Sequence, residues 1–577
     1  MFNITLIVGI TLGNACMQLL VAETMLSGRR IPPGASRPFR VLVGATGCLM
    51  VGLASTFVFS TFAGVWAMWH YREEPELELR ALNMPAQHVP SVDVMLPRYK
   101  EPWAMFKPTV EAALALDYPG RVEVYVLDDG ADADLRERLT KELGLGTRPG
   151  LHYTVREDRR YAKGGNMQHG LRISSGDLVC CFDADMVVNP AFLLRLVPHM
   201  LHYNAAKGRW GLADDIGLVQ TPQSFYNGDD PLVDAMDGNM AHLMNVFYPA
   251  YSGIGAAPCI GTGYIAQRAA LDDIGGFTCG LAVEDVTTSV CLVAAGWQCR
   301  WVAQRLVEGL SPATLSEFYD QRMRWTAGGM QQLFYQGLIL RRVPIKPIWG
   351  AEWDERVRRG VPGFSRTARF AWVPLTVYWV IPIAVITYCY MAMATQIVID
   401  YRDDHEVPLY MGVAVVIIVC FYQFGMAFPM GKLRELQLSA RALYLYLPVF
   451  MYALYLLGTG QMNPLRNPKF KASSEAYSNG AVAFPSLAWI NVAIVVVGWA
   501  LWTADVYVAS RHHIQLGMYL CIGAEGIMML WLTWAMSPIL KEIPSAFGCG
   551  SPPPEEHHQL PAASPKFTQR TRDMQRV

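Results

Sequence analysis

Charged residues are scarce in this sequence of 577 residues. Only 17% are Asp, Glu, Lys or Arg, whereas 52% are hydrophobic, so the chain is more apolar than an average soluble protein. The formal net charge is −1, which offers no strongly basic surface and argues against a nucleic-acid partner. The composition indicates a protein that meets a lipid bilayer.

Features of secreted and lipid-anchored proteins are also missing. No Lys or Arg precedes the first apolar run, which argues against a secretory signal peptide, and the sequence has no lipidation motif. The 12 Cys residues show no repeated spacing. We therefore expect neither a disulfide framework nor a zinc site, and interpret the cysteines as free thiols.

Long apolar runs occur near the two ends of the chain. Each is about as long as the ~20 residues that cross a bilayer, or longer. A further stretch, 441–460, carries four Tyr at near-helical spacing and is interpreted as an interfacial helix or a seventh span. The six main runs are 2–26, 41–69, 368–399, 409–430, 487–508 and 514–540.

These runs divide the chain into four parts. Basic residues gather beside the later spans on the side of the central domain, and the positive-inside rule places that domain in the cytosol. The loop with Arg29, Arg30, Arg37 and Arg40 disagrees with this orientation. We expect two transmembrane helices in 1–74, a soluble domain in 75–350, further transmembrane and interfacial helices in 351–545, and a disordered cytosolic tail in 546–577.

Within 75–350, short apolar runs alternate with helical patterns. This alternation predicts an α/β domain with a mostly parallel sheet covered by helices on both faces. In such sheets, ligands bind beyond the carboxyl ends of the strands. Strands are expected at 92–96, 122–127, 152–155, 178–182 and 217–220, and helices at 104–116, 135–143, 165–173 and 191–201.

Two of the predicted strands end in acidic pairs. Asp128 and Asp129, followed by Gly130, come after one strand, and Asp183 and Asp185 come after another. Carboxylates beside a strand end can share a divalent cation, which in turn can hold a diphosphate. Asp-Gly is also a common turn dipeptide, so one pair alone would be ambiguous. Two pairs on one sheet favour a site for a metal and a nucleotide.

Three further motifs follow along the chain. A loop of small residues spans 261–264, and Asp285 lies in the first turn of a predicted helix at 283–295. Taken singly, these features are typical of a tight turn and of an acid that favours a helix N-terminus. On a helix, Gln321, Arg324 and Trp325 share one face, where an Arg-Trp pair is usually a surface cation–π contact.

In this order, the motifs resemble those of the processive family 2 glycosyltransferases, and most closely the cellulose synthases and cellulose-synthase-like β-glucan synthases. Segments such as 93–97, 261–264 and 321–325 resemble the fungal cellulose-synthase-like group. The resemblance implies a GT-A-like α/β domain inserted between transmembrane α-helices of a multi-pass plasma-membrane protein. It also implies inverting transfer of glucose from UDP-glucose to a growing β-glucan acceptor, which then crosses the lipid bilayer.

The resemblance further implies a role for each motif residue. Asp285 would be the catalytic base, although Val283 stands where the family has Thr, and Asp183 and Asp185 would bind Mg²⁺ or Mn²⁺. Lys163 and Arg324 would face the diphosphate. The other substrate-binding residues would be Tyr99, Glu101 and Asp128 at the uridine, Gly261 and Thr262 in the small-residue loop, and Gln321 and Trp325 at the acceptor.

Several alternatives stay open on the sequence alone. The segment 466–480 lies where cellulose synthases have a gating loop, but only Phe470 and Ser473 match it, and an ordinary basic connector fits equally well. A synthase of another β-polysaccharide, of the chitin or hyaluronan type, and a non-processive lipid glycosyltransferase share the donor chemistry. A transporter is less favoured because the spans carry few charges. The sequence leaves the linkage, the choice of metal and homo-oligomer formation open.

Overall fold

The computed structural model describes most of the chain up to residue 334 and several helices after residue 446. The described residues are 4–27, 31, 34–70, 74–225, 243–279, 281–312, 315–334, 447–461, 486–511 and 516–546, with isolated positions in 386–394, at 413 and in 441–445. The expected spans at 368–399 and 409–430 and the segment 466–480 therefore fall almost wholly outside the described residues, as does the tail beyond 546.

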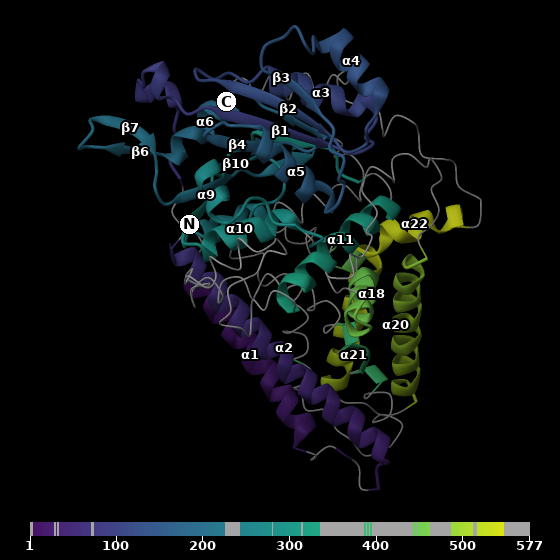
Figure 1. Cartoon of the computed structure of the whole chain (residues 1–577). Coiled ribbons are helices and arrows are strands. Elements are labelled where there is room, and N and C mark those ends of the chain that lie inside the picture. The colour runs from purple at the N-terminus through teal and green to yellow at the C-terminus, as the bar shows by residue number, and fades with distance from the viewer. Residues whose placement is uncertain are drawn as a thin grey trace.

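The chain begins with two long helices that lie side by side and reach from the foot of the molecule to the central domain (Figure 1). Helix α1 spans Ile4–Leu26 and α2 spans Arg37–His70, which matches the positions expected for the first two spans. Helix α2 packs against α8 (Tyr248–Ser252) of the central domain. This contact links the N-terminal hairpin to the α/β domain.

A seven-stranded sheet forms the centre of the α/β domain, with the order β11-β8-β10-β4-β1-β2-β3. Five of its strands were expected, and all neighbouring strands pair in parallel except those of β10. The expected mostly parallel α/β fold is confirmed. The strands are β1 (Val92–Arg98), β2 (Val122–Asp128), β3 (Leu151–Thr154), β4 (Leu178–Cys181), β8 (Ile216–Gln220), β10 (Tyr264–Gln267) and β11 (Gln298–Trp301).

Helices cover both faces of this sheet (Figure 1). Successive side chains of a strand point to opposite faces, so Val94 joins one core with α3, α4 and α6, whereas Met95 joins the other with α5, α9 and α10. These helices span Trp103–Leu114 (α3), Ala133–Leu143 (α4), Ala162–Ile173 (α5), Phe192–Leu196 (α6), Arg268–Asp273 (α9) and Glu284–Ala294 (α10).

One predicted helix is shorter than expected. The segment 191–201 holds only α6 and a 3₁₀ turn, η3 (Val197–Met200), before the chain enters a hairpin of β6 (Leu201–Asn204) and β7 (Arg209–Leu212). Pro198 lies at the start of the 3₁₀ turn, where its missing N–H prevents continuation of the α-helical ladder. A small sheet of β5 (Met186–Val188), β12 (Val307–Gly309) and β9 (Gln223–Phe225) was also not predicted.

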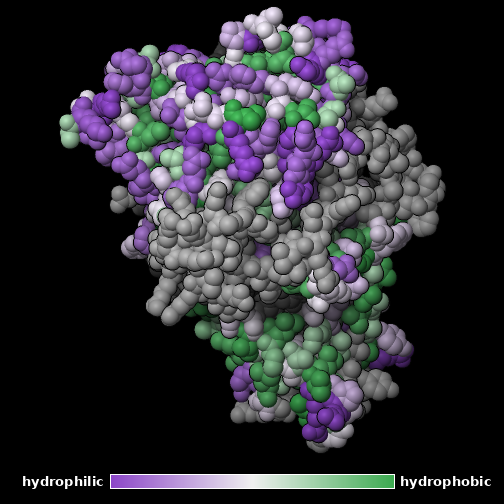
Figure 2. Space-filling model, viewed as in Figure 1, coloured by the Kyte–Doolittle hydropathy of each residue, from purple (hydrophilic) through white to green (hydrophobic). Residues whose placement is uncertain are grey.

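The C-terminal helices stand below the α/β domain (Figure 1), in the part of the molecule where hydrophobic surface gathers (Figure 2). Two helices in the described residues are long and apolar enough to cross a membrane, at Ala488–Ala509 and Met518–Ala535. The expectations for 487–508 and 514–540 agree with them. The helices are α18 (Leu447–Gly458), α20 (Ala488–Ala509), α21 (Leu516–Ala535) and α22 (Ser537–Ala546).

Candidate active site

The site forms at the carboxyl ends of three neighbouring parallel strands. Strand β1 leads to Tyr99 and Glu101, β2 ends at Asp128, and β4 leads to Asp183 and Asp185. Because β4, β1 and β2 are adjacent in the sheet, residues separated by more than 80 positions in the sequence meet at one edge. The strand order thus brings both predicted acidic pairs to the same end of the sheet.

Lys163, in the first turn of α5, connects the second acidic pair to the small-residue loop. Its Nζ lies 2.5 Å from Oδ1 of Asp183 and donates a hydrogen bond of 2.8 Å to the carbonyl oxygen of Gly261. Burial acts to lower the pKa of Lys163, but the Asp183, Glu284 and Asp285 carboxylates outweigh it and raise the pKa well above its usual value. Lys163 is therefore a fixed positive charge in this site.

Asp285 and Lys163 both lie beside Gly261 in the loop of small residues. A Cβ at Gly261 would lie 2.6 Å from Oδ2 of Asp285 and 3.3 Å from Nζ of Lys163, and the positive φ of +88° also favours glycine here. The backbone N–H of Asp183 donates to Oγ1 of Thr262 at 3.2 Å. Gln220 is fully buried and donates from Nε2 to the carbonyl of Thr262, which holds the loop in place.

Asp285 has the properties of a proton acceptor. It stands in the first turn of α10, as expected, and is partly accessible to solvent. Its enclosed position raises its pKa to about 7, with the neighbouring Glu284 carboxylate adding to the shift and Lys163 opposing it. An acid whose pKa lies close to neutrality is suited to general base catalysis.

The second acidic pair fits a divalent cation. Its enclosed position raises the pKa of Asp185 to about 7, and the charges of Asp183 and Glu101 add to the shift. The pKa of Glu101 is also raised, by burial and by Asp183. Three carboxylates thus lie near one another, and Lys163 is the cation that pairs with Asp183. Such a surplus of hard oxygen ligands suits Mg²⁺ or Mn²⁺.

The number of ligands also bears on the metal. In the described part of the chain, no set of three or more His, Cys, Asp or Glu side chains is arranged to hold a metal. Mg²⁺ in nucleotide sites is commonly bound by one or two carboxylates and completes its shell with phosphate oxygens and water. Asp183 and Asp185 therefore fit a cation that arrives with a nucleotide diphosphate.

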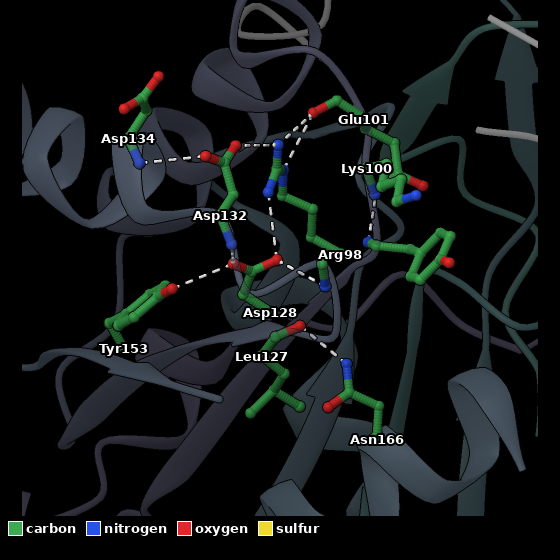
Figure 3. A network of polar contacts seen from close by, with 11 residues as sticks. Arg98, Lys100, Glu101, Leu127, Asp128, Asp132, Asp134, Tyr153 and Asn166 are labelled. Atoms are coloured by element: carbon green, nitrogen blue, oxygen red, sulfur yellow. Dashed lines mark hydrogen bonds and ion pairs between the residues drawn. The ribbon is translucent and has the colours of Figure 1, made fainter. Parts of the chain in front are cut away.

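Asp128, the first acid of the first pair, is already neutralised by the protein (Figure 3). Oδ1 of Asp128 accepts from Nη1 of Arg98 at 3.1 Å and from the N–H of Gly130 at 3.0 Å. Oδ2 accepts from the N–H of Asp132 at 2.8 Å and from the Tyr153 hydroxyl at 3.0 Å. Each oxygen of this buried carboxylate thus accepts two hydrogen bonds. Contact between Asp128 and a uridine stays a prediction.

Arg98 ties the loop after β1 to the loop after β2 (Figure 3). Its guanidinium donates to the Glu101 carbonyl at 2.7 Å and contacts Oδ2 of Asp132 at 3.0 Å, in addition to Asp128. The two loops approach so closely that a Cβ at Gly130 would overlap the Tyr99 carbonyl oxygen. This contact explains why glycine follows the acidic pair.

Helix α11 (Leu315–Phe334) carries the third motif and lies against the segment that bears Asp285. A Cβ at Gly328 would lie 2.5 Å from a methyl carbon of Val283, and Oε1 of Gln331 accepts from the N–H of Ala282 at 2.9 Å. Val283, the departure from the family motif, therefore packs into the notch at Gly328 and leaves Asp285 in place.

Trp325 lies on α11, partly buried against the core that contains Val290 and Trp301. The guanidinium of Arg322 lies 4.2 Å from the centre of its ring, within the range of a cation–π contact. Gln321 and Arg324 are half-buried on the same helix. Contact of Gln321, Arg324 or Trp325 with an acceptor or a diphosphate stays a prediction.

The opposite side of α11 packs on the membrane-type helices. Leu315, Phe318 and Tyr319 share a core with Leu445 and Phe450. At its centre, the Tyr319 hydroxyl donates to the carbonyl of Leu445 at 3.0 Å, and Nδ2 of Asn491 in α20 donates to the Tyr319 hydroxyl at 2.8 Å. Helix α11 therefore joins the catalytic domain to α18 and α20.

The sequence reasoning missed two arginines that organise the site, Arg98 and Arg156. Both lie beside predicted motifs, since Arg98 directly precedes Tyr99 and Arg156 begins the basic segment ahead of α5. The sequence feature that could have identified them is an arginine at or just after a predicted strand, in a sheet whose strand ends also carry acids. The partner of each, however, lies about 30 positions away in the sequence.

Comparison with known proteins agrees with this geometry. The family model "Glycosyl transferase family group 2" matches residues 178–430. The chain is 30% identical over 297 residues to "Cellulose synthase 2" of Novacetimonas hansenii, which covers 49% of this chain and 17% of that protein. It is 28% identical over 340 residues to the "Cellulose synthase catalytic subunit (UDP-forming)" of Xanthomonas axonopodis pv. citri, covering 57% of this chain and 42% of that protein.

Among solved structures, the mannosyltransferase PcManGT of Pyrobaculum calidifontis, in complex with GDP-Man and Mn²⁺, overlaps with a TM-score of 0.44 at 17% identity. The overlap covers 69% of this chain and 98% of that chain. Because this TM-score is low, the fold assignment rests on the strand order of the sheet.

The fold and the site define a nucleotide-sugar glycosyltransferase domain, as the motifs predicted. More particularly, the chain is similar to cellulose synthases and to other members of glycosyltransferase family group 2. The chain spans less than half the length of these two relatives.

Proposed function

We propose that the chain is an inverting, processive glycosyltransferase that polymerises UDP-glucose into a β-glucan and moves the product across a membrane. The observation that carries the proposal is the convergence of Lys163, Asp183, Gly261 and Asp285 at the carboxyl end of β4. The attachment of α11 to both this site and the apolar helices supports the link to a membrane.

The reaction needs a proton acceptor and a stabilised leaving group. The acceptor hydroxyl attacks C1 of the donor sugar and passes its proton to Asp285, while the bond from C1 to the UDP oxygen breaks. A single attack of this kind inverts the anomeric centre, so an α-linked donor yields a β-linked product. Negative charge that develops on UDP faces the ammonium group of Lys163.

A divalent cation held by Asp183 and Asp185 would supply further charge stabilisation for the diphosphate. The positive charge of Lys163 beside Asp183 lies on the same side of the site. Arg324 on α11 would add a second positive charge from the acceptor side.

The proposed setting is a multi-pass plasma-membrane protein with the catalytic domain in the cytosol. The apolar helices α20 and α21 support the membrane location, and cellulose synthases among the relatives are consistent with it. The growing glucan would pass from the site beside α11 to the region between the apolar helices, because α11 contacts both the site and these helices.

The proposal is tested with full-length protein in lipid nanodiscs, supplied with labelled UDP-glucose or UDP-N-acetylglucosamine and either Mg²⁺ or Mn²⁺. Linkage-specific glycanases then digest the product. We expect long polymer from UDP-glucose that a β-glucanase degrades. A single sugar on a lipid would instead establish a non-processive lipid glycosyltransferase, and polymer from UDP-N-acetylglucosamine alone would replace the β-glucan with a chitin-type product.

A further inference from the structure

The backbone just ahead of Lys163 has an unusual conformation. Tyr161 and Ala162 are consecutive residues with φ of +67° and +44°, a region that residues with a Cβ rarely adopt. Strain of this kind persists only when surrounding contacts impose it, and it clusters at functional sites. Lys163 follows directly in the first turn of α5.

Arg156 supplies the contacts that impose this turn. Its Nη1 donates to the carbonyl oxygen of Arg160 at 2.8 Å, and its Nη2 donates to the carbonyl oxygen of Ala162 at 2.9 Å. The guanidinium therefore holds the carbonyl groups on both sides of Tyr161. The absence of a side chain at Gly165 leaves room for the guanidinium, because a Cβ there would lie 2.5 Å from Nη1 of Arg156.

Arg156 is in turn held by the second acid of the Asp-Asp-Gly motif. Nε donates to Oδ1 of Asp129 at 2.7 Å and Nη2 donates to Oδ2 at 2.6 Å, a two-pronged pair. Both side chains are only 8% exposed. A bidentate pair with this little exposure fixes the geometry of both side chains. An exposed ion pair, in contrast, contributes little to stability.

We infer that Asp129 and Arg156 are positioning residues that fix Lys163 against Asp183 and Gly261 by holding the strained turn at 160–162. The inference rests on the proposed function, because it assigns Lys163 to the diphosphate of the donor. It gives the two acids of the first pair different tasks. Asp128 joins the loops after β1 and β2, whereas Asp129 acts through Arg156 on α5.

The test uses Arg156→Lys, which keeps the positive charge but cannot form the guanidinium fork. Affinities for UDP with Mg²⁺ and for uridine are measured by titration calorimetry on the full chain. We expect UDP affinity to fall by about tenfold or more, since small misplacements at a binding site are costly. Uridine affinity should stay within about twofold, because uridine has no diphosphate to meet Lys163. Asp129→Asn should show the same pattern.

A second variant separates positioning from direct contact. Ala162→Gly removes the cost of positive φ, so adding it to Arg156→Lys should restore most of the UDP affinity. Arg80→Lys is the control, because Nη2 of Arg80 donates to both carboxylate oxygens of Asp117 on the exposed surface, and it should leave both affinities unchanged.

Three results would overturn the inference. These are unchanged UDP affinity in Arg156→Lys and Asp129→Asn, equal losses for UDP and uridine, or no recovery on adding Ala162→Gly. The last result would mean that Arg156 touches the ligand itself. Wild-type protein that fails to bind UDP would overturn the proposed function and the inference together, whereas wild-type binding with unaffected variants would overturn the inference alone.

Discussion

The two acidic pairs at the carboxyl edge of the sheet differ sharply in their surroundings. Asp128 and Asp129 are buried, and their oxygens are met by Arg98, Tyr153 and Arg156. In contrast, Asp183 and Asp185 lie near a third carboxylate, Glu101, and Lys163 is the cation paired with Asp183. The first pair is balanced inside the protein, whereas the second retains negative charge that a ligand can balance.

This difference teaches that an acidic pair at a strand end does not by itself mark a metal site. Both pairs follow parallel strands of one sheet, and either could hold a cation on sequence grounds. The arginines in reach decide between a structural and a functional role. Removing Asp128 should therefore cost stability, and removing an acid of the second pair should cost activity.

The largest expected effect is on the second pair. Asp183→Asn, or chelation of divalent cations with EDTA, should abolish polymer synthesis and weaken UDP binding, because one cation would link the protein to the diphosphate. The measurement is incorporation of labelled sugar, together with UDP titration. Full activity of protein that metal analysis shows to be cation-free would remove the metal from the account.

Asp285→Asn comes next, with an expected loss of about 10²–10⁴ in turnover because the proton acceptor is gone. UDP affinity should stay near that of the wild type. Since the pKa of Asp285 is about 7 in the nucleotide-free site, its basic form increases as pH rises through neutrality, and the wild-type rate should rise with it. Initial rates across this range provide the measurement. Near-normal turnover of the variant would place the base elsewhere.

Asp128, in the first pair, should affect stability instead. Asp128→Asn removes the buried anionic partner of Arg98 and leaves only the more exposed Asp132, and breaking a buried pair costs about 3–5 kcal/mol. At roughly 2–4 °C per kcal/mol for a domain of this size, the melting temperature should fall by about 6–20 °C. Thermal unfolding of the purified protein tests this.

Asp185→Asn is the matched change in the second pair. It removes a carboxylate that lies close to other acids, so metal-free protein should melt no lower than the wild type. An equal loss of melting temperature in Asp128→Asn and Asp185→Asn would contradict the division between the two pairs.

The smallest expected effect concerns the acceptor. Trp325→Ala should shorten the polymer while UDP affinity stays close to normal, because the donor-side acids are untouched. Loss of an aromatic contact with a sugar removes about 1 kcal/mol, which is roughly a fivefold change in acceptor affinity. Product length on a sizing column is the measurement. Unchanged length would make Trp325 a packing residue under Arg322.

Much of the α/β domain could be predicted from the sequence, and the reasons are local. Continuous apolar runs predicted β1, β2, β4 and β8 to within a residue or two, because a buried parallel strand needs apolar side chains on both faces. Strand β10, which runs antiparallel to its neighbours, strand β11 and the β6–β7 hairpin were missed. Strand direction depends on partners distant in the chain, and the periodicity of a short segment does not contain it.

The site shows the same division between local and distant information. Asp183, Asp185 and Asp285 were predicted because each belongs to a contiguous motif. The roles of Arg98 and Arg156 depend on partners about 30 positions away, and spacing alone could not pair them. The same limitation hid the four hydrogen bonds that the Asp128 carboxylate accepts.

The central claim is that the second acidic pair, and not the first, binds the cation. The most direct test measures Mn²⁺ binding to the folded full-length chain by electron paramagnetic resonance at saturating UDP. We expect tight Mn²⁺ binding to the wild type and to Asp128→Asn, and at least about tenfold weaker binding to Asp183→Asn, because only the second pair would ligate the cation. Undiminished Mn²⁺ binding to Asp183→Asn, with loss of binding in Asp128→Asn, would contradict the account.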